Sequence, residues 1–381
     1  MIAVPPTNLM TDPMILFLFT GALFLFYALL LTWLSGGFRR LRPSLIRHYP
    51  SLSIIVPAHN EARHLPVLLS CLERQIYPSD RLEIILVNDR SNDGTEKIMK
   101  NFVNHHARSF MISIKDVDEE FSPKKYAITR GIESATGEIV LTTDADAIPG
   151  PRWAEAMAGC FAPDTDMVIG YAPYRTDGPY DSFFHRLLAL EYFVLGCIGA
   201  ASLGRGYPIS ANGANLAYKR KRFISTGGFG PGRCMISGDD DLLLHRFRYE
   251  RGFHVRYALS RDARVFNNPP STLLRFIKQR LRFSSKHLRY PPRLLAAMSL
   301  TYAFYSGILL LIAGSILMPS LRCGTAILLS GKIAVELFFL SRGKPYLEQR
   351  NLIRYYPFAF FPHLLYVVLI PFFARFLRTR W

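Results

Sequence analysis

The run Ile139–Asp146, IVLTTDAD, decides the fold of this chain. Its first part is apolar and β-branched and has turn residues on both sides, which predicts a buried strand over residues 139–143. Residues two apart in an extended chain point to the same side, so Asp144 and Asp146 are expected to converge at the carboxyl end of that strand. Open α/β sheets bind their ligands at this end.

Two carboxylates so close together repel each other and are costly to desolvate, unless a cation lies between them. A hard divalent ion with oxygen ligands, which itself holds phosphates, meets that requirement. For an isolated D-x-D pattern, however, a polar strand end whose carboxylates are solvated is the more common structure. The rest of the chain has to separate these two interpretations.

The composition favours a membrane-associated protein. Half of the 381 residues are hydrophobic and 28 are Phe, which is too apolar for a purely soluble chain. The formal charge of +17 comes from Lys and Arg that crowd beside apolar segments. This arrangement suits an anionic membrane face or a phosphate-bearing substrate at least as well as nucleic acid, for which no recognisable binding module is present.

Cysteine usage excludes two kinds of site. The five cysteines are odd in number, lie far apart and include no C-x-x-C pair, so neither a zinc site nor a disulfide framework is supported. We expect buried, reduced thiols in a domain that faces the cytosol.

The segment Met14–Leu34 contains no charged residue and is long enough to cross a bilayer as a helix. Asp12 precedes it, whereas a cleaved signal peptide would have a basic start and a shorter apolar stretch. Four arginines follow it: Arg39, Arg40, Arg42 and Arg47. By the positive-inside rule, the amino terminus faces outward and the chain after Arg39 begins in the cytosol.

Strands and helices are predicted to alternate after this segment. The expected strands are 53–57, 82–87, 112–117 and 139–143, and the expected helices run through 65–72, from 95 and over 124–134. Such alternation indicates an α/β fold with a mostly parallel sheet and right-handed crossovers. No G-x-G-x-x-G follows the first strand, which disfavours a Rossmann dinucleotide site.

Polar side chains follow three of these strands: Asn60 with Glu61, Asp89 with Asp93, and Asp144 with Asp146. Acidic and amide groups at the carboxyl ends of strands indicate hydrogen bonds to a base or ribose, together with a metal for phosphates. The run Asp89–Gly94 is also typical of an ordinary turn and helix cap.

The segments Ile54–Glu61, Val87–Thr95 and Thr143–Asp146 resemble the nucleotide-sugar half of the family 2 inverting glycosyltransferases, which have a GT-A fold with helices on both faces of the sheet. Further segments resemble the family's remaining motifs, in family order: the basic helix start Pro123–Ile128, the acceptor-side loop Gly213–Asn215, the acidic motif Ser237–Asp241, and Gln279–Phe283 for the Q-x-x-R-W motif of the membrane-bound branch. Two departures are Phe283 in place of the final Trp, and Gly-Asp-Asp-Asp in place of the common Glu-Asp.

The resemblance implies a role for each of these residues. Asp146, helped by Asp144, would hold Mg²⁺ or Mn²⁺ against the diphosphate of a nucleotide sugar. The residues expected at the nucleotide sugar are Asn60, Glu61, Asp89, Asp93, Lys124 and Asp144. Asp240 would be the general base, and Asp239 is the alternative because the motif leaves the base open by one position. The residues expected at the acceptor and diphosphate are Asn215, Gln279, Arg280, Arg282 and Phe283.

Basic and apolar residues interleave over residues 273–293, which predicts an amphipathic helix on the membrane surface. Three apolar segments follow, at 294–318, 323–340 and 357–373, and the last is expected to be broken by Pro362 and Pro371. Three crossings here would place the carboxyl tail outside, which its arginines Arg375, Arg378 and Arg380 contradict. Either the last segment re-enters without crossing, or the tail is an exception to the rule.

These patterns predict a membrane helix over 1–40, a cytosolic GT-A domain over 41–272, an interfacial segment over 273–293 and membrane helices over 294–381. The protein would lie in the cytoplasmic membrane with its catalytic domain facing the cytosol. The resemblance implies metal-dependent transfer of a sugar, with a lean toward a UDP-sugar as donor. About four spans favour transfer of one sugar to a membrane lipid such as a polyprenyl phosphate, diacylglycerol, sphingoid or carotenoid-type alcohol. Processive polysaccharide synthesis is one alternative, and a non-catalytic membrane scaffold or transporter is another.

Overall fold

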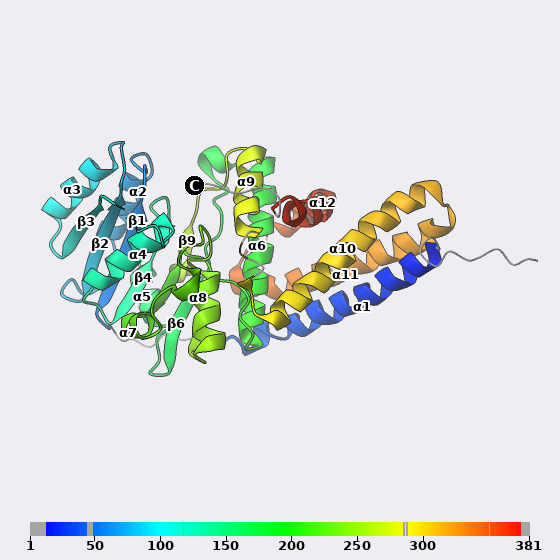
Figure 1. Cartoon of the computed structure of the whole chain (residues 1–381), viewed down its shortest axis with the longest axis horizontal. Helices are drawn as coiled ribbons and strands as arrows, with labels where there is room; N and C mark the ends of the chain where they lie inside the picture. Colours follow the sequence, from blue (N-terminus) through cyan, green and yellow to red (C-terminus); the bar gives the residue numbers. More distant parts are fainter. Residues whose placement is uncertain are drawn as a thin grey trace, which may run out of the picture.

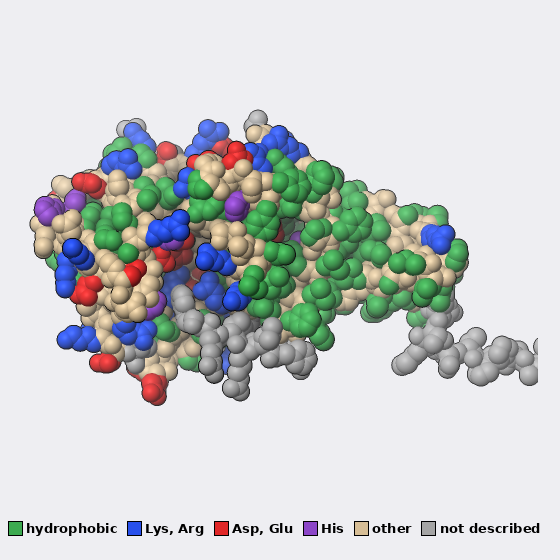
Figure 2. Space-filling model, turned by 90° about the horizontal axis from the view of Figure 1, so that it is seen from above, with side chains coloured by type: hydrophobic (Ala, Val, Ile, Leu, Met, Phe, Trp, Pro, Cys, Tyr) green, Lys and Arg blue, Asp and Glu red, His purple; other side chains and the backbone are tan. Residues whose placement is uncertain are grey.

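The computed structural model describes residues 13–43, 49–116, 118–284, 286, 289–349 and 351–374. A layered α/β unit lies at one end, and long helices extend away from it (Figure 1). Charged side chains gather on the α/β unit, whereas hydrophobic side chains cover most of the helical extension on the face drawn in Figure 2. The apolar segments of the sequence thus form the helical extension, and the more charged segments form the α/β unit.

The central sheet has the strand order β3-β2-β1-β4-β7-β6-β8 within the described residues. Its strands are β1 (Leu52–Ala58), β2 (Leu82–Asp89), β3 (Ser109–Ile114), β4 (Ile139–Thr142), β6 (Thr165–Gly170), β7 (Leu216–Lys219) and β8 (His254–Ala258). β1 pairs in parallel with β2 and β4, and β7 runs antiparallel to β4 and β6. The prediction of a mostly parallel α/β sheet is therefore confirmed.

Strand β1 shows why these segments form a central sheet, since all seven of its residues are buried. Ile54 and Val56 belong to one hydrophobic core and Ile55 to the other, as the alternation of side chains along a strand requires. Leu65 and Leu68 of α2 lie in the first core, and Ala127 and Ile128 of α4 lie in the second. The sheet is thus covered on both faces.

The helices that accompany the sheet are α2 (Leu65–Glu73), α3 (Thr95–His105), α4 (Pro123–Ser134), α5 (Trp153–Ala158), α7 (Arg220–Ser225) and α8 (Asp241–His245). Two short strands, β5 (Ile148–Pro149) and β9 (Val265–Phe266), form a separate antiparallel pair. The third strand was predicted at 112–117, but β3 lies three residues earlier, and Val117 is outside the described residues. The register explains this shift, because Ser109 is paired with Ile84 and Ile114 with Asp89 at the end of β2.

Five helices among the described residues are long and apolar enough to cross a membrane, judged by length and composition. They are α1 (Pro13–Ser35), α6 (Phe183–Gly204), α10 (Pro292–Leu317), α11 (Ser320–Leu347) and α12 (Tyr356–Ala374). The sequence predicted about four and missed α6, whose apolar run is interrupted by Arg186 and Glu191. In Figure 1, α6 stands between the sheet and the bundle of α1, α10 and α11.

The predicted break in the last apolar segment is wrong, because α12 continues through Pro362 and Pro371. Proline removes one backbone donor, and local adjustments in helices of this kind can satisfy the carbonyl that is freed. The tail residues Arg375, Arg378 and Arg380 lie outside the described part of the chain.

A buried ion pair joins four of these helices. Lys332 Nζ lies 2.6 Å from Glu336 Oε1, and both residues are on α11. Glu336 also accepts hydrogen bonds from the hydroxyls of Tyr27 on α1, Tyr305 on α10 and Tyr356 on α12. Polar groups in an apolar environment are costly unless they are paired, so this cluster specifies how the four helices pack.

Candidate active site

The strand-end residues come together in one cavity. Asp89 ends β2, and Asp144 and Asp146 follow β4. These three carboxylates, with Glu61 and Lys124, line a cavity of about 1910 Å³. We call this side of the cavity the strand end.

The strand end carries more negative charge than its nearest cation neutralises. Burial raises the pKa of Asp146 to about 6, and the nearby carboxylates of Asp144 and Glu61 act in the same direction. Lys124 Nζ lies 2.7 Å from Asp144 Oδ1. No group of three or more His, Cys, Asp or Glu side chains capable of holding a metal occurs among the described residues. Two hard carboxylates that leave the remaining positions to phosphate oxygens and water are nevertheless a donor set that fits Mg²⁺ or Mn²⁺.

Two residues predicted at the nucleotide sugar organise loops beside the strand end. Asp93 accepts hydrogen bonds from the backbone amides of Thr95 and Ala62, at 2.9 and 3.1 Å. Asn60 has a positive φ of 57° and its Oδ1 accepts from the amide of Asn92 at 2.9 Å. Neither side chain is among those that line the cavity. Their contacts join the loop after β1 to the loop after β2.

Asn215, predicted on the acceptor side, is fully buried beneath the cavity. Its Nδ2 donates to the carbonyl oxygens of Tyr171 and Ala263, and its Oδ1 accepts from Trp153 Nε1 at 2.9 Å. Asn212 and Gly213, from the same loop, line the cavity instead.

The acidic motif places three consecutive carboxylates at the cavity wall. Asp239 Oδ2 lies 2.8 Å from Lys124 Nζ, so Lys124 bridges Asp239 and Asp144. Asp240 and Asp241 share a second lysine, Lys286, whose Nζ lies 3.0 Å from Asp240 Oδ1 and 2.6 Å from Asp241 Oδ2. The motif therefore connects the strand end with the segment that follows α9 (Leu273–Ser284).

The environments of these carboxylates push their pKa values apart. Burial acts to raise the pKa of Asp239, but Lys124, Lys125 and Lys286 together lower it to about 2. Burial and the adjacent Asp241 raise the pKa of Asp240 above its ordinary value, against the opposing effect of Lys286. A carboxylate with a raised pKa is the better proton acceptor. The electrostatics favour Asp240 over Asp239 as the base.

Lys125 holds the loop that precedes the acidic motif, and Gly213 leaves the space that the Asp239 side chain occupies. Lys125 is buried and donates to the carbonyl oxygens of Gly232, Met235 and Ser237 at 2.8–3.0 Å. A Cβ at Gly213 would come within 2.6 Å of Asp239 Oδ2, which is closer than side-chain carbons approach. A side chain at residue 213 would therefore displace Asp239.

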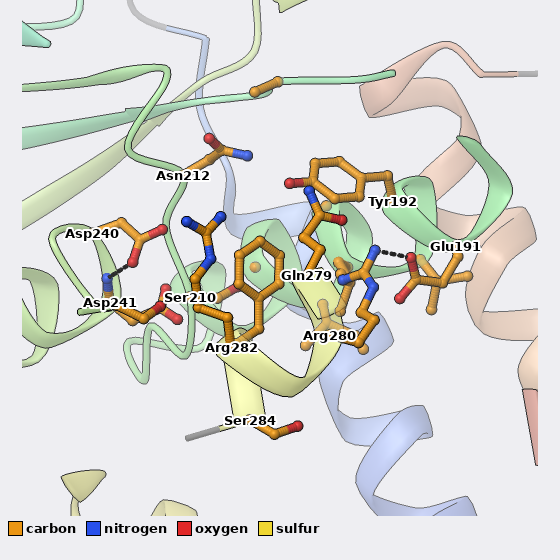
Figure 3. Close-up of a pocket in the computed structure, with 18 of the residues that line it drawn as sticks. Glu191, Tyr192, Ser210, Asn212, Asp240, Asp241, Gln279, Arg280, Arg282 and Ser284 are labelled. Atoms are coloured by element: carbon orange, nitrogen blue, oxygen red, sulfur yellow. Dashed lines mark hydrogen bonds and ion pairs between the residues drawn. The ribbon is translucent and has the colours of Figure 1, made fainter. Parts of the chain in front are cut away.

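Helix α9 forms the opposite wall of the cavity, together with the adjoining parts of α6, α10, α11 and α12. We call this side of the cavity the helix end. Gln279 Oε1 accepts from the hydroxyl of Tyr174 at 3.0 Å, and the Arg282 side chain extends toward Asn212 beside Asp240 (Figure 3). Gln279, Arg282 and Phe283 all line the cavity.

Arg280, the second residue of the α9 motif, is held away from the strand end. It pairs with Glu191 of α6, which also accepts a hydrogen bond from Tyr366 of α12 at 2.8 Å (Figure 3). The rings of Tyr192 and Phe276 lie 5.5 and 5.0 Å from its guanidinium carbon. These contacts fix α9 against α6 and α12.

We expect Glu191→Gln to destabilise the protein, because Arg280 would remain a buried cation without its counter-ion. Breaking such a pair costs about 3–5 kcal/mol, whereas replacing both partners with neutral side chains, as in Glu191→Gln/Arg280→Met, costs less. Thermal unfolding in detergent measures the difference. Arg275→Met, on the exposed part of α9, is the matched control. Equal melting temperatures for Glu191→Gln and the parent protein would contradict this assignment.

Sequence reasoning missed several residues that the fold brings to the site. Lys286 was assigned only to the membrane interface, yet it contacts Asp240 from 46 residues away. Tyr290, which donates to Asp241 Oδ2 at 2.6 Å, and Glu191 were not assigned at all. Their positions in the sequence give no signal, because the contacts depend on how α9 folds back over the sheet.

Comparison with known proteins identifies the sheet-bearing part of the chain. Residues 53–237 match the family model described as glycosyl transferase family 2. The protein named "Probable glycosyltransferase YdaM" of Bacillus subtilis (strain 168) is 24% identical over 240 residues, which cover 63% of this chain and 56% of that protein. The poly-beta-1,6-N-acetyl-D-glucosamine synthase of Staphylococcus epidermidis (strain ATCC 35984 / DSM 28319 / BCRC 17069 / CCUG 31568 / BM 3577 / RP62A) is 27% identical over 239 residues, which cover 61% and 53% of the two chains. The chain thus spans about half the length of these curated relatives.

A solved structure shares the fold over most of the chain. The mannosyltransferase PcManGT from Pyrobaculum calidifontis, solved in complex with GDP-Man and Mn²⁺, is similar with a TM-score of 0.57 at 21% identity, covering 88% of this chain and 99% of that one. The GT-A fold expected from the resemblance is confirmed by this similarity. Residues 53–237 of the chain therefore form a glycosyl transferase family 2 domain.

Proposed function

We propose that this protein is an inverting glycosyltransferase that moves a sugar from a nucleotide sugar to a hydroxyl group of a membrane lipid. The observation that carries the proposal is the continuity of the cavity, which reaches from Asp89, Asp144 and Asp146 past Asp240 to Tyr305 and Phe360 of the long helices. A water-soluble donor can enter at the strand end, while an apolar acceptor can lie against the helices.

The strand end supplies the groups that a nucleotide sugar requires. In this proposal Asp89 would form hydrogen bonds to the nucleoside, and Asp144 and Asp146 would hold a divalent ion at the diphosphate. A bound Mg²⁺ or Mn²⁺ would neutralise charge on the leaving diphosphate. Lys124, between Asp144 and Asp239, adds a cation next to the same group. The similar fold of a protein solved with GDP-Man and Mn²⁺ supports this use of the strand end without selecting between GDP and UDP.

Asp240 is the residue that would activate the acceptor. Its carboxylate takes the proton of the acceptor hydroxyl while that oxygen forms a bond to the anomeric carbon. The bond from the anomeric carbon to the diphosphate breaks on the opposite side, and its electron pair leaves with the nucleoside diphosphate. One displacement of this kind inverts the configuration of the sugar. Asp239 then has a positioning role, through Lys124.

The membrane arrangement belongs to the same proposal. α1, α10, α11 and α12, which lie within the predicted membrane segments 1–40 and 294–381 apart from the first two residues of α10, would anchor the catalytic domain, 41–272, on the cytosolic side of the cytoplasmic membrane, with 273–293 at the interface. Polymer synthesis is a second candidate because some relatives are polysaccharide synthases. The apolar part of the cavity, between α10 and α12, favours one transfer to a lipid over extrusion of a chain.

Membranes that contain the full chain provide the test of function. They would be incubated with radiolabelled UDP-glucose, UDP-galactose, UDP-N-acetylglucosamine or GDP-mannose and Mn²⁺, with an Asp240→Asn membrane preparation as control. We expect label to enter an organic-extractable glycolipid. Label in an insoluble polymer would favour the second candidate, and no cation-dependent binding of any donor to the purified protein would refute the proposal.

Lys286 provides a test of the base through pH. Its positive charge acts to lower the pKa of Asp240, so Lys286→Met should raise that pKa further. Because the base acts when deprotonated, the acid limb of the kcat/KM profile should move to higher pH, and activity on that limb should fall about tenfold for each pH unit that the limb moves. Lys286→Arg keeps the charge and should keep the limb near its original position. A profile unchanged by Lys286→Met would show that Asp240 is not the titrating base.

A further inference from the structure

The helix end of the cavity distinguishes two classes of acceptor lipid. A lipid monophosphate offers an oxygen that is already ionised near neutral pH, and it carries about −1.5 to −2 charges. Such a group needs cations to hold it and no base to deprotonate it. A lipid alcohol is uncharged, and its hydroxyl must lose a proton during transfer, so it needs a base. The charges on the cavity wall can therefore be compared with each requirement.

Among the described residues the wall is acidic, with nine Asp and Glu side chains against five Lys and Arg side chains. The excess persists beyond the strand end. Four of the carboxylates lie in the acidic motif or on α6: Glu191, Asp239, Asp240 and Asp241, whereas the charge of Glu336 is balanced by Lys332. A phosphate in this part of the cavity would meet a net excess of negative charge, and the repulsion is screened less in a partly buried cavity than in bulk water.

The cations of this region already hold carboxylates. Lys286 is 5% exposed and contacts both Asp240 and Asp241, and Arg280 is 5% exposed and pairs with Glu191. If Lys286 or Arg280 turned toward a phosphate, its buried carboxylate partner would lose its counter-ion next to the negative phosphate, which is energetically costly.

Arg282 also lines this wall, and it extends beside Asp240 toward Asn212 (Figure 3). One guanidinium next to the acidic motif does not balance a dianion. The same guanidinium is well placed beside the diphosphate of the donor, as the resemblance of the α9 motif implies. The part of the cavity that remains for the acceptor then offers hydrogen-bonding groups and the carboxylate of Asp240 as a base.

The cavity surface near the membrane suits a hydrocarbon. Leu294, Leu295 and Met298 of α10 face it, as do Val367 and Ile370 of α12. Burying an alkyl chain against such side chains contributes about 0.8 kcal/mol for each methylene. The apolar portion lies between the long helices, where an acceptor drawn from the bilayer would keep its chain out of water.

We infer that the acceptor is an uncharged lipid alcohol, whose hydroxyl lies at Asp240 and whose hydrocarbon lies against α10 and α12. The inference rests on the proposed function, and it excludes lipid monophosphates as acceptors. In the transfer step the alcohol oxygen bonds to the anomeric carbon, its proton passes to Asp240, and the nucleoside diphosphate departs with the electrons of the broken bond.

Matched acceptor pairs test the inference on the full chain in phosphatidylcholine nanodiscs with Mn²⁺ and the donor that binds. The pairs are undecaprenol with undecaprenyl phosphate, and dioleoylglycerol with dioleoylphosphatidic acid. We expect the alcohol of at least one pair to be glycosylated at least about tenfold faster than its phosphate, and Asp240→Asn to lower that transfer about 100-fold or more, as loss of a base does. Faster transfer to either phosphate, transfer to neither alcohol, or transfer to an alcohol that persists in Asp240→Asn would overturn the inference.

Measuring donor binding in the absence of acceptor distinguishes failure of the acceptor inference from failure of the proposed function. If a nucleotide sugar binds with cation dependence and a lipid phosphate is then glycosylated, the proposed catalysis stands and only the acceptor class is wrong. If no donor binds, the proposed function itself fails. Asp240→Asn should bind donor like the parent protein, which shows that the variant is folded.

Discussion

Asp240→Asn is expected to lower sugar transfer by about 10²- to 10⁴-fold, the usual contribution of a positioned general base. Asparagine has nearly the same shape as aspartate, but it cannot take the proton of an alcohol. Initial rates at saturating donor measure the loss, and titration calorimetry with donor and Mn²⁺ shows whether binding survives. We expect the dissociation constant of the donor to change little, because Asp240 contacts Lys286 and the backbone of Asp241, away from the strand end.

Asp239→Asn is the matched comparison for this variant. Asp239 is paired with Lys124, which also contacts Asp144, so its loss should act mainly on donor affinity and KM. If Asp239→Asn abolishes turnover at saturating donor while Asp240→Asn remains active, the base is Asp239 and the electrostatic assignment is wrong.

Asp146→Asn is expected to give the second large effect, a loss of cation-dependent donor binding. Removing even an outer-shell partner of a metal ligand typically costs 10- to 100-fold in metal affinity, and we expect at least about that for Asp146 itself. The surrounding negative charge that helps to raise its pKa to about 6 would also attract a divalent ion. Calorimetry of donor binding with Mn²⁺, and again after EDTA treatment, measures the cation-dependent part.

Asp93→Asn provides the control for that measurement. Its carboxylate lies in the adjacent loop and caps the backbone amides of Thr95 and Ala62 without lining the cavity. We expect this variant to lose some stability and to keep cation-dependent binding. A loss of cation dependence in Asp93→Asn but not in Asp146→Asn would move the metal site to the loop after β2.

The local sequence was sufficient to predict the parallel half of the sheet. Strands such as β1 are apolar along their whole length, and turn residues mark their ends, so their burial on both faces follows from composition. The clustering of Asp89, Asp144 and Asp146 follows as well, since the carboxyl ends of parallel strands lie at one edge. The β3 boundary could not be predicted in the same way, because its register depends on pairing with β2.

The roles of motif residues on the helices were harder to predict. The sequence shows that Arg280 and Arg282 are two apart on α9, which places them on different faces of the helix. It does not show that Glu191, 89 residues earlier, lies opposite Arg280. Asn215 is similar, since its neighbour Asn212 reaches the cavity while Asn215 is fixed beneath it by Trp153. Such distinctions depend on contacts between distant segments.

The cluster around Glu336 has a consequence for how the protein is made. Tyr27 meets this carboxylate only after 309 further residues have been added to the chain. At roughly 5–20 residues per second, ribosomal synthesis of that length takes about 15–60 seconds. All strands of the central sheet are translated during this interval. The sheet-bearing domain can therefore fold before α10, α11 and α12 have been synthesised and can pack against α1.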